Sequence, residues 1–482
     1  MRFFRNILVW TLILSAFTLL AFGPRPQLRK GESGVVTIEY WEKWGGLEAT
    51  QMQSIIDEFN QTVGKEKGIF VRYLSVSSVN QKTLVATAAN VPPDVAGMWD
   101  GNIPQFSALG ALAPLDELAA GYGITEEYYK PVYWKGCRYD GKLYGLVSTP
   151  AAVALHWNKI VFQEAEENLR AAGLDPDRAP RTLDELDAYA AALDLISDEG
   201  WVERAGYVPV QPGFWWTHFM PFWFGGELYD EANRKLCLDI PEAVAAYEWV
   251  RSYSVKFGVK SITEFRSSQQ GAGTISTVEP FIVGTLAMEQ QGPWRANYFN
   301  VLAPHLNEWK MPREEAARLP VEERRKNYAW GAAPFPSADG RELVCYAGFD
   351  VLTIPSASRH KREAFEFIAF VNRRDVMERL CSMHSKNSPL RDVTAAFIEN
   401  HPNPYVQVFE DLSSSPHARG LPRVPIWAEV QAELSTIAQE IFLLKSEPEE
   451  ALTRVQKRMQ AKLDRFFEID DRRRKSERAG PS

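Results

Sequence analysis

Aromatic residues that stand beside charged and amide residues are the feature of this sequence that points most directly to chemistry. Fifteen tryptophans occur in 482 residues. The pairings of ring and polar neighbour are Trp44 with Lys43 and Glu48, Trp99 with Asp100 and Asn102, and Trp294 with Arg295. Flat rings suit the C–H faces of a sugar, while carboxylates, amides and guanidinium groups bind its hydroxyls. This combination predicts a site for a polyhydroxylated ligand.

Two further blocks are unusually rich in rings. The sequence reads GFWWTHF at 213–219 and PFWFGG at 221–226, which places Trp215, Trp216 and Trp223 close together. Any single tryptophan is more readily explained as a core residue. The loop-flanked set taken together favours ligand contact, because an ordinary solvated loop would not carry so many rings.

Catalytic and metal-binding patterns are missing from the sequence. It contains no Gly-x-Ser-x-Gly, no His-Glu-x-x-His, no phosphate-binding glycine loop and no EF-hand spacing, and its seven histidines are scattered. Glycosidase chemistry would need two facing carboxylates, for which Glu227, Glu279 and Glu289 are the candidates. We therefore expect no catalytic residues, no metal and no cofactor.

Composition limits the classes of partner and compartment. The net charge is −8, and the first thirty residues hold five basic residues and no acidic one, so the remainder is more acidic still. Such a chain is a poor partner for nucleic acid. The four cysteines, Cys137, Cys237, Cys345 and Cys381, are far apart and lack zinc-ligand spacing, which favours buried thiols over disulfides.

The N-terminus carries a targeting signal. Arg2 and Arg5 precede an unbroken apolar run at 7–22, which is slightly long for a signal-peptide core and short for a membrane-spanning helix. Pro24 makes the cleavage site poor, and no nearby cysteine could carry a lipid. We interpret residues 1–30 as a signal peptide or an N-terminal membrane anchor. The protein is expected in the cell envelope, periplasmic or extracytoplasmic.

Hydrophobic patterning predicts alternating strands and helices. Strands are expected at 35–41, 70–76 and 94–98, separated by a helix with Met52, Ile55, Ile56 and Phe59 on one face and another at 82–90. A second unit follows, with a strand at 152–157 and a helix that starts at the capping box 182–185. Later elements are strands at 285–288 and 351–354 and a helix at 361–373. This order predicts an α/β fold with largely parallel sheets.

The C-terminal region predicts a long helix and a tail. Its apolar stripe comprises Leu452, Val455, Met459, Leu463 and Phe466. Residues 467–482 are charge-dense and are expected to form a frayed tail. The charged stretch at 312–327 is interpreted as a surface insertion.

Six blocks in order give the chain a resemblance to a known family. They are VTIEYW at 36–41; PDVAGMW at 93–99 with FSALGALAPLD at 106–116; DGKLYGL at 140–146 with ALHWNK at 154–159; FIVGTLAM at 281–288 with GPW at 292–294; GFDVLTI at 348–354; and SPLR at 388–391. In these blocks the chain resembles the extracellular solute-binding proteins of ABC importers, in the sugar-binding group similar to maltose-binding protein. The likeness runs from about residue 35 to residue 466.

The resemblance implies a two-lobed periplasmic-binding-protein-like fold with several chain crossovers, each lobe being a sheet flanked by helices. Lobe one would comprise 35–148 and 287–346, and lobe two 151–284 and 350–466. The crossovers are expected near 148–150, 284–287 and 347–350. Proteins of this family close by a hinge motion around the ligand.

The resemblance also implies where the ligand binds. Lobe one would contribute Trp44, Glu48, Trp99, Asp100 and Asn102, and Trp294 and Arg295 follow the family's Gly-x-Trp; lobe two would contribute Trp215, Trp216, Trp223, Phe349, Asp350 and Arg391. Two positions depart from the family pattern. Phe349-Asp350 replaces a small, glycine-rich pair, and Thr149-Pro150-Ala151 lies where some relatives offer a carboxylate.

The implied function is that of a non-enzymatic substrate-binding component of an ABC-type carbohydrate importer, which captures a mono- or oligosaccharide. Its partners would be the sugar and the membrane permease subunits, and the protein would be a monomer. Two alternatives stay open. One is an orphan binding protein or sensor for a non-sugar solute. The other is a glycan-active enzyme, which needs a carboxylate pair about 5–10 Å apart across the cleft.

Overall fold

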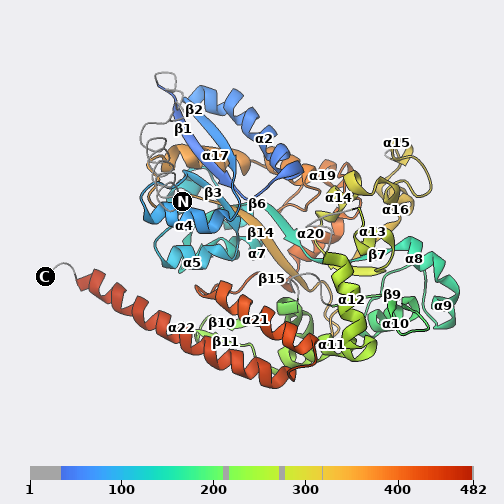
Figure 1. Ribbon diagram of the computed structural model, residues 1–482. Coiled ribbons are helices and arrows are strands. Elements are labelled where there is room, and N and C mark those ends of the chain that lie inside the picture. The colour runs from blue at the N-terminus through green and yellow to red at the C-terminus, as the bar shows by residue number, and fades with distance from the viewer. Residues whose placement is uncertain (1–33, 210–216, 271–276, 317, 480–482) are drawn as a thin grey trace, which may run out of the picture.

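The computed structural model describes residues 34–209, 217–270, 277–316 and 318–479, which form two α/β lobes (Figure 1). The first lobe is built on a sheet with the strand order β15-β14-β3-β1-β2, in which β6 pairs with β14. Its strands are β1 (Val36–Glu42), β2 (Ile69–Ser75), β3 (Val95–Trp99), β6 (Gly145–Ala152), β14 (Cys345–Thr353) and β15 (Ala418–Arg419). The predicted strands at 35–41, 70–76 and 94–98 are thus confirmed within a residue or two.

The first sheet is mixed, although the sequence predicted a largely parallel one. Strand β1 is parallel to β2 and to β3, as alternating strands and helices require. Strand β14 is antiparallel to both β3 and β6. The reason is that β6 and β14 carry the chain between the lobes, in opposite directions, and do not belong to a strand–helix–strand unit.

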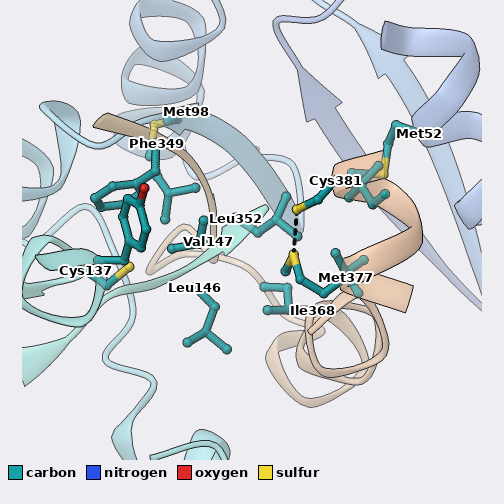
Figure 2. Close-up of a cluster of buried hydrophobic side chains, with 14 of the residues drawn as sticks. Met52, Met98, Cys137, Leu146, Val147, Phe349, Leu352, Ile368, Met377 and Cys381 are labelled. Carbon is teal, nitrogen blue, oxygen red and sulfur yellow. Dashed lines mark hydrogen bonds between the residues drawn. The ribbon is translucent and has the colours of Figure 1, made fainter. Parts of the chain in front are cut away.

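Helices cover this sheet with the predicted apolar faces. Helix α2 (Gly46–Gln61) buries Met52, Ile55, Ile56 and Phe59, and α17 (Lys361–Val371) lies in the same lobe (Figure 1). Figure 2 shows part of this core, in which Met377 and Cys381 of α18 (Arg374–Met383) lie near Leu352 of β14. All four cysteines are unpaired; three are buried and Cys237 is half-buried.

The second lobe holds a three-stranded antiparallel sheet in the order β12-β7-β13. The strands are β7 (Ala154–Asn158), β12 (Met288–Gln291) and β13 (Trp330–Ala333). Helices α10 (Leu183–Leu193), α11 (Pro241–Phe257) and α21 (Trp427–Phe442) belong to its core. Helix α10 begins after Thr182, whose hydroxyl accepts a hydrogen bond of 3.1 Å from the backbone N–H of Glu185.

The chain changes core close to each predicted crossover: between Val147 and Val153, between Ile282 and Leu286, and at the start of β14. It changes core again between Leu412 and Val424, where no crossover was predicted. Residues 350–414, expected in lobe two, therefore belong to lobe one, because β14 pairs along its length with β3 and β6.

Residues 287–346, expected in lobe one, connect both lobes. Strands β12 and β13 pair with β7, while Phe299 and Trp330 pack in the first core.

The C-terminal helix is longer than predicted. Helix α22 (Pro448–Ala479) includes most of the stretch expected to be a frayed tail and runs along one edge of the molecule (Figure 1). Its first half packs in the second core. Near the end of α22, Arg473 donates to the carbonyl oxygen of Ala108 at 3.2 Å, and Arg474 pairs with Asp140 at 2.5 Å. Ala108 and Asp140 both belong to lobe one. The charges that suggested a solvated tail thus hold a contact between the lobes.

Two other predicted features are a charged surface stretch and a membrane segment. The charged stretch at 312–327 forms α15 (Arg313–Ala316) and α16 (Val321–Asn327), where Arg325 also donates to the carbonyl oxygen of Pro404 at 2.8 Å. Among the described residues, no helix combines the length and the apolar character needed to cross a membrane. The predicted signal or anchor segment lies outside the described residues.

Candidate ligand-binding site between the lobes

Asp350 of β14 lies at the centre of the site and pairs with two lysines. Its Oδ1 lies 2.9 Å from Nζ of Lys43, the residue after β1, and its Oδ2 lies 2.9 Å from Nζ of Lys386, in the turn after α18. Thr149 of β6 donates to Oδ2 at 3.0 Å and accepts from Lys386 at 2.9 Å. We call Lys43, Thr149, Asp350 and Lys386 the lysine–aspartate cluster. It lies at the crossing strands, where the two lobes meet.

The electrostatics of Asp350 follow from these neighbours. Burial alone would raise the pKa of this carboxyl group, but the Lys386 and Lys43 ammonium groups hold its pKa well below the ordinary value. Burial lowers the pKa of Lys43, and Asp350 and Glu42 together raise it by more. Lys43 also contacts Glu42 Oε1 at 3.2 Å and donates to the carbonyl oxygen of Met98 at 3.2 Å. Both charges are therefore fixed at neutral pH.

Three tryptophan rings surround the cluster. Lys43 Nζ lies 5.3 Å from the ring centroid of Trp44 and 5.1 Å from that of Trp99. Lys386 Nζ lies 5.8 Å from the centroid of Trp44 and 5.9 Å from that of Trp294. Because Trp294 packs against the second core, the rings come from both lobes. The three rings differ in access: Trp44 is buried, Trp294 is half-buried and Trp99 is 47% exposed.

Glu48 connects α2 to α14 (Arg295–Leu302). It accepts a hydrogen bond from Tyr298 of α14. Burial raises the pKa of Glu48, and Lys386 opposes that rise in part. Beside it, His384 is fully buried with its ring centroid 4.8 Å from that of Trp44, and burial together with Lys386 lowers its pKa to about 3. His384 therefore lines the site as an uncharged side chain.

Asp100 and Asn102 follow β3 beside the exposed ring of Trp99. Asp100 Oδ1 accepts from the backbone N–H of Gly101 at 2.9 Å. Within the part of the chain that the structure describes, nothing donates to Asp100 Oδ2 or to Asn102 Oδ1, although both atoms are buried. Burial raises the pKa of Asp100 to about 8. Buried acceptors without donors indicate a place where a ligand hydroxyl could bind.

Arg295 has a structural part in this arrangement. It is buried, its Nε donates to Glu289 Oε1 at 2.7 Å, and its Nη1 pairs with Glu279. Burial raises the pKa of Glu289 to about 7, with Arg295 opposing part of the rise. The carboxylates named as glycosidase candidates are therefore held in ion pairs, since Glu227 likewise pairs with Arg419 at 2.5 Å.

Several residues predicted for the site lie elsewhere. Trp223 is a core residue whose Nε1 donates to the carbonyl oxygen of Val344 at 3.0 Å. Phe349 packs edge-on against Tyr133 of α7 (Pro131–Gly136), in the core that Figure 2 shows beside Cys137. Arg391 is exposed, and its backbone N–H donates to the carbonyl oxygen of Tyr128 at 3.1 Å. Trp215 and Trp216 lie outside the described residues.

The two faces of β14 differ because consecutive side chains of a strand point in opposite directions. Asp350 points to the lysines, and Phe349 points to α7. On the Phe349 side lies a cavity of about 680 Å³, which we call the rear cavity; its walls are α7, residues 227–231 and residues 413–423. This cavity is therefore separate from the tryptophan cluster.

Four residues that complete the site were not among the predicted ligand-binding residues. Lys43 was named only as the polar neighbour of Trp44 and Thr149 only as a departure from the family pattern, while His384 and Lys386 were missed. Lys43 had a signal, since it directly follows a strand and precedes Trp44. Lys386 and His384 had none, because the turn after α18 has no period and its partners lie far away in the sequence. Among the described residues, no group of three His, Cys, Asp or Glu side chains is placed to hold a metal ion.

Comparison with known proteins supports the arrangement. Among solved structures, CpMnBP1 with mannotriose bound is 26% identical with a TM-score of 0.71, over 87% of this chain and 99% of that one. The sugar-binding protein MalE of Xanthomonas citri is 20% identical with a TM-score of 0.68, over 90% of this chain and 99% of its own, a likeness of fold alone.

Curated sequences add a second group of relatives. The sn-glycerol-3-phosphate-binding periplasmic protein UgpB of Salmonella typhimurium is 25% identical over 226 residues, which is 44% of this chain and 48% of the relative. The match thus spans about half the length of these curated relatives. The profile of the family described as bacterial extracellular solute-binding protein matches residues 45–378, more than half of the chain. The chain belongs to the bacterial extracellular solute-binding protein family.

Proposed function

We propose that this protein captures a mono- or oligosaccharide between its lobes and delivers it to the permease of an ABC importer. The observation that carries the proposal is the gathering of Trp44, Trp99 and Trp294, from both lobes, around the lysine–aspartate cluster. Exposed ring faces next to buried hydrogen-bonding groups match the alternating apolar and polar surface of a sugar.

Each part of the site has a role in this proposal. Trp99 and Trp294 stack on the ligand, because they are the accessible rings. Asp100 and Asn102 accept hydrogen bonds from its hydroxyls. The lysine–aspartate cluster holds the crossing strand in place beneath the ligand, and Trp44 supports the cluster from the core.

Support for a sugar comes also from CpMnBP1, whose structure holds mannotriose and whose fold covers most of this chain. A second candidate ligand is sn-glycerol 3-phosphate, which is favoured by the similarity to UgpB. The two candidates differ in charge, so they make different demands on the site.

Binding would close the lobes around the crossing strands β6 and β14. The lobes already meet in this arrangement through Lys386 and Trp294. A ligand that contacts both lobes binds the closed state more tightly than the open state and so stabilises it. The permease would bind the closed state. The apolar run at 7–22 would either direct export or tether the protein to the membrane.

A thermal-shift screen of residues 34–482 tests the proposal. The panel would contain mannobiose, mannotriose, maltose, cellobiose, a polyamine and a short peptide. A ligand that binds only the folded state raises the melting temperature, so at least one sugar should raise it in a concentration-dependent way. A response to the polyamine or peptide with none to the sugars would contradict carbohydrate capture.

A further inference from the structure

We infer that the site selects an uncharged sugar and rejects phosphate esters and uronates, because every cation at the site already has a carboxylate partner. This inference rests on the proposed function and specifies the class of sugar. It assigns Asp350 as the residue that sets the selectivity, since this one carboxylate pairs with both lysines.

The pairing of charges can be followed cation by cation. Lys43 contacts Asp350 and Glu42, at 2.9 and 3.2 Å, and a third hydrogen bond goes to a backbone carbonyl. Lys386 contacts Asp350 at 2.9 Å. These contacts engage three N–H groups of Lys43, and Asp350 and Thr149 engage two of the three of Lys386, so few remain for an oxyanion.

The remaining cation near the tryptophans is also paired. Arg295 contacts both Glu289 and Glu279, so two carboxylates share one guanidinium group. Four carboxylates, those of Asp350, Glu42, Glu279 and Glu289, thus pair with three cations. The cations are Lys43, Lys386 and Arg295. A phosphate or carboxylate on the ligand would therefore enter a site with no net positive charge to offset its desolvation, which costs several kcal/mol for a buried ion.

The segments that the structure does not describe in this part of the chain cannot add a cation. Residues 210–216 read VQPGFWW and residues 271–276 read GAGTIS, and neither contains a charged side chain or a histidine.

The unsatisfied groups of the site point the same way. Asp100 Oδ2 and Asn102 Oδ1 are buried acceptors that lack a donor within the described ranges. A ligand hydroxyl can form a hydrogen bond with each, whereas a fully ionised phosphate or carboxylate group placed at Asn102 Oδ1 has no hydrogen to donate.

Matched pairs of ligands test the inference on the wild-type protein. Isothermal titration would compare mannobiose and mannose with mannose 6-phosphate, and glycerol with glycerol 3-phosphate, and would include galacturonate. We expect the tightest binding from an uncharged sugar, with the charged probes at least tenfold weaker. Equal or tighter binding of mannose 6-phosphate, glycerol 3-phosphate or galacturonate would overturn the selectivity. Carbohydrate capture would survive binding of a charged sugar, whereas no response to any sugar would contradict both.

Substitution of Asp350 gives a gain-of-function test. Asp350→Asn leaves two lysines with a neutral amide between them, so affinity for mannose 6-phosphate or glycerol 3-phosphate should rise at least tenfold. Adding Lys386→Met should abolish that gain, since Lys386 loses the carboxylate that it contacts in the wild type, whereas Lys43 keeps its contact with Glu42. The matched control is Glu366→Gln, which breaks an ion pair with Lys67 at 2.7 Å on the outside of lobe one and should leave selectivity unchanged.

Folding is monitored by circular dichroism and melting temperature. A folded Asp350→Asn protein that gains no affinity for either phosphate would contradict the role of Asp350. If that variant does not fold, the matched pairs on the wild-type protein still decide the selectivity.

Discussion

Phe349 and Asp350 are neighbours in β14, yet the two faces of the strand that they occupy have opposite chemistry. The Asp350 face carries two lysines, a buried histidine and three tryptophans, and both lysines are held in ion pairs with Asp350. The Phe349 face is packed against α7, and the rear cavity lies on that side. The alternation of a strand at the junction of two lobes thus places a ligand site and a structural support one residue apart.

The comparison teaches that position near the junction is not sufficient to make a residue part of the site. Both residues are buried and both lie where the chain crosses between lobes. Only the side chain that points toward the lysines can influence a ligand, while the other determines how firmly α7 is held.

The largest expected effect concerns the rear face. Phe349→Ala should lower the free energy of unfolding by about 3–5 kcal/mol, because a buried ring is removed and a cavity remains. Sugar affinity measured on the folded fraction should be unchanged. Chemical denaturation and isothermal titration check the two parts, and a large loss of affinity in the folded variant would mean that the faces are not separate.

A smaller effect is expected from pH on the ligand face. The pKa of His384 is about 3 in the folded protein and about 6.5 in an unfolded chain. Between these values the unfolded state binds a proton that the folded state does not, so stability falls as the pH drops below about 6.5. At pH 5 this residue should account for a loss of about 2 kcal/mol relative to pH 7.5.

Denaturation at the two pH values, in the wild type and in His384→Gln, measures that contribution. The variant should lose about that much less stability between pH 7.5 and pH 5. His417→Gln, which alters a half-buried histidine directly before β15, is the matched control. An identical pH dependence in all three proteins would show that His384 does not stay neutral.

The smallest effect is expected at the C-terminal contact between the lobes. Arg474→Ala removes the contact with Asp140, a pair that is partly exposed on both sides. Such pairs contribute less than about 1 kcal/mol, so the melting temperature should barely change. A small shift in sugar affinity would show that α22 influences the opening of the lobes, and small-angle scattering with and without sugar would detect it. A collapse of stability would mean that α22 has a larger structural role than its contacts suggest.

Local patterns explain how much of the fold could be predicted. The strand at 36–42 and the helix with Met52, Ile55, Ile56 and Phe59 have clear periods, and they appear as expected. The crossover between Leu412 and Val424 was not predicted because a segment that changes lobe has no local signature. The end of α22 was misread because a charged helix face that contacts another lobe resembles a solvated tail.

The site was predictable only in part, for a related reason. Trp99, Asp100 and Asp350 stand out beside polar or aromatic neighbours in the sequence, and they meet at the junction of the lobes. Trp223 stands out in the same way, yet it is a core residue. A local concentration of aromatic residues in the sequence does not distinguish a core from a ligand-binding surface. Lys386 could not be found, because its partners Thr149 and Asp350 meet it only through the fold.

The most direct test of sugar capture between the lobes is isothermal titration of the double variant Trp99→Ala/Trp294→Ala with the sugar that most strongly stabilises the wild type. Trp201→Ala, which removes a half-buried ring contacted by Lys260 away from the site, is the control. The account predicts that the double variant stays folded and shows no measurable binding, while the control binds as the wild type does. A folded double variant with wild-type affinity would contradict it.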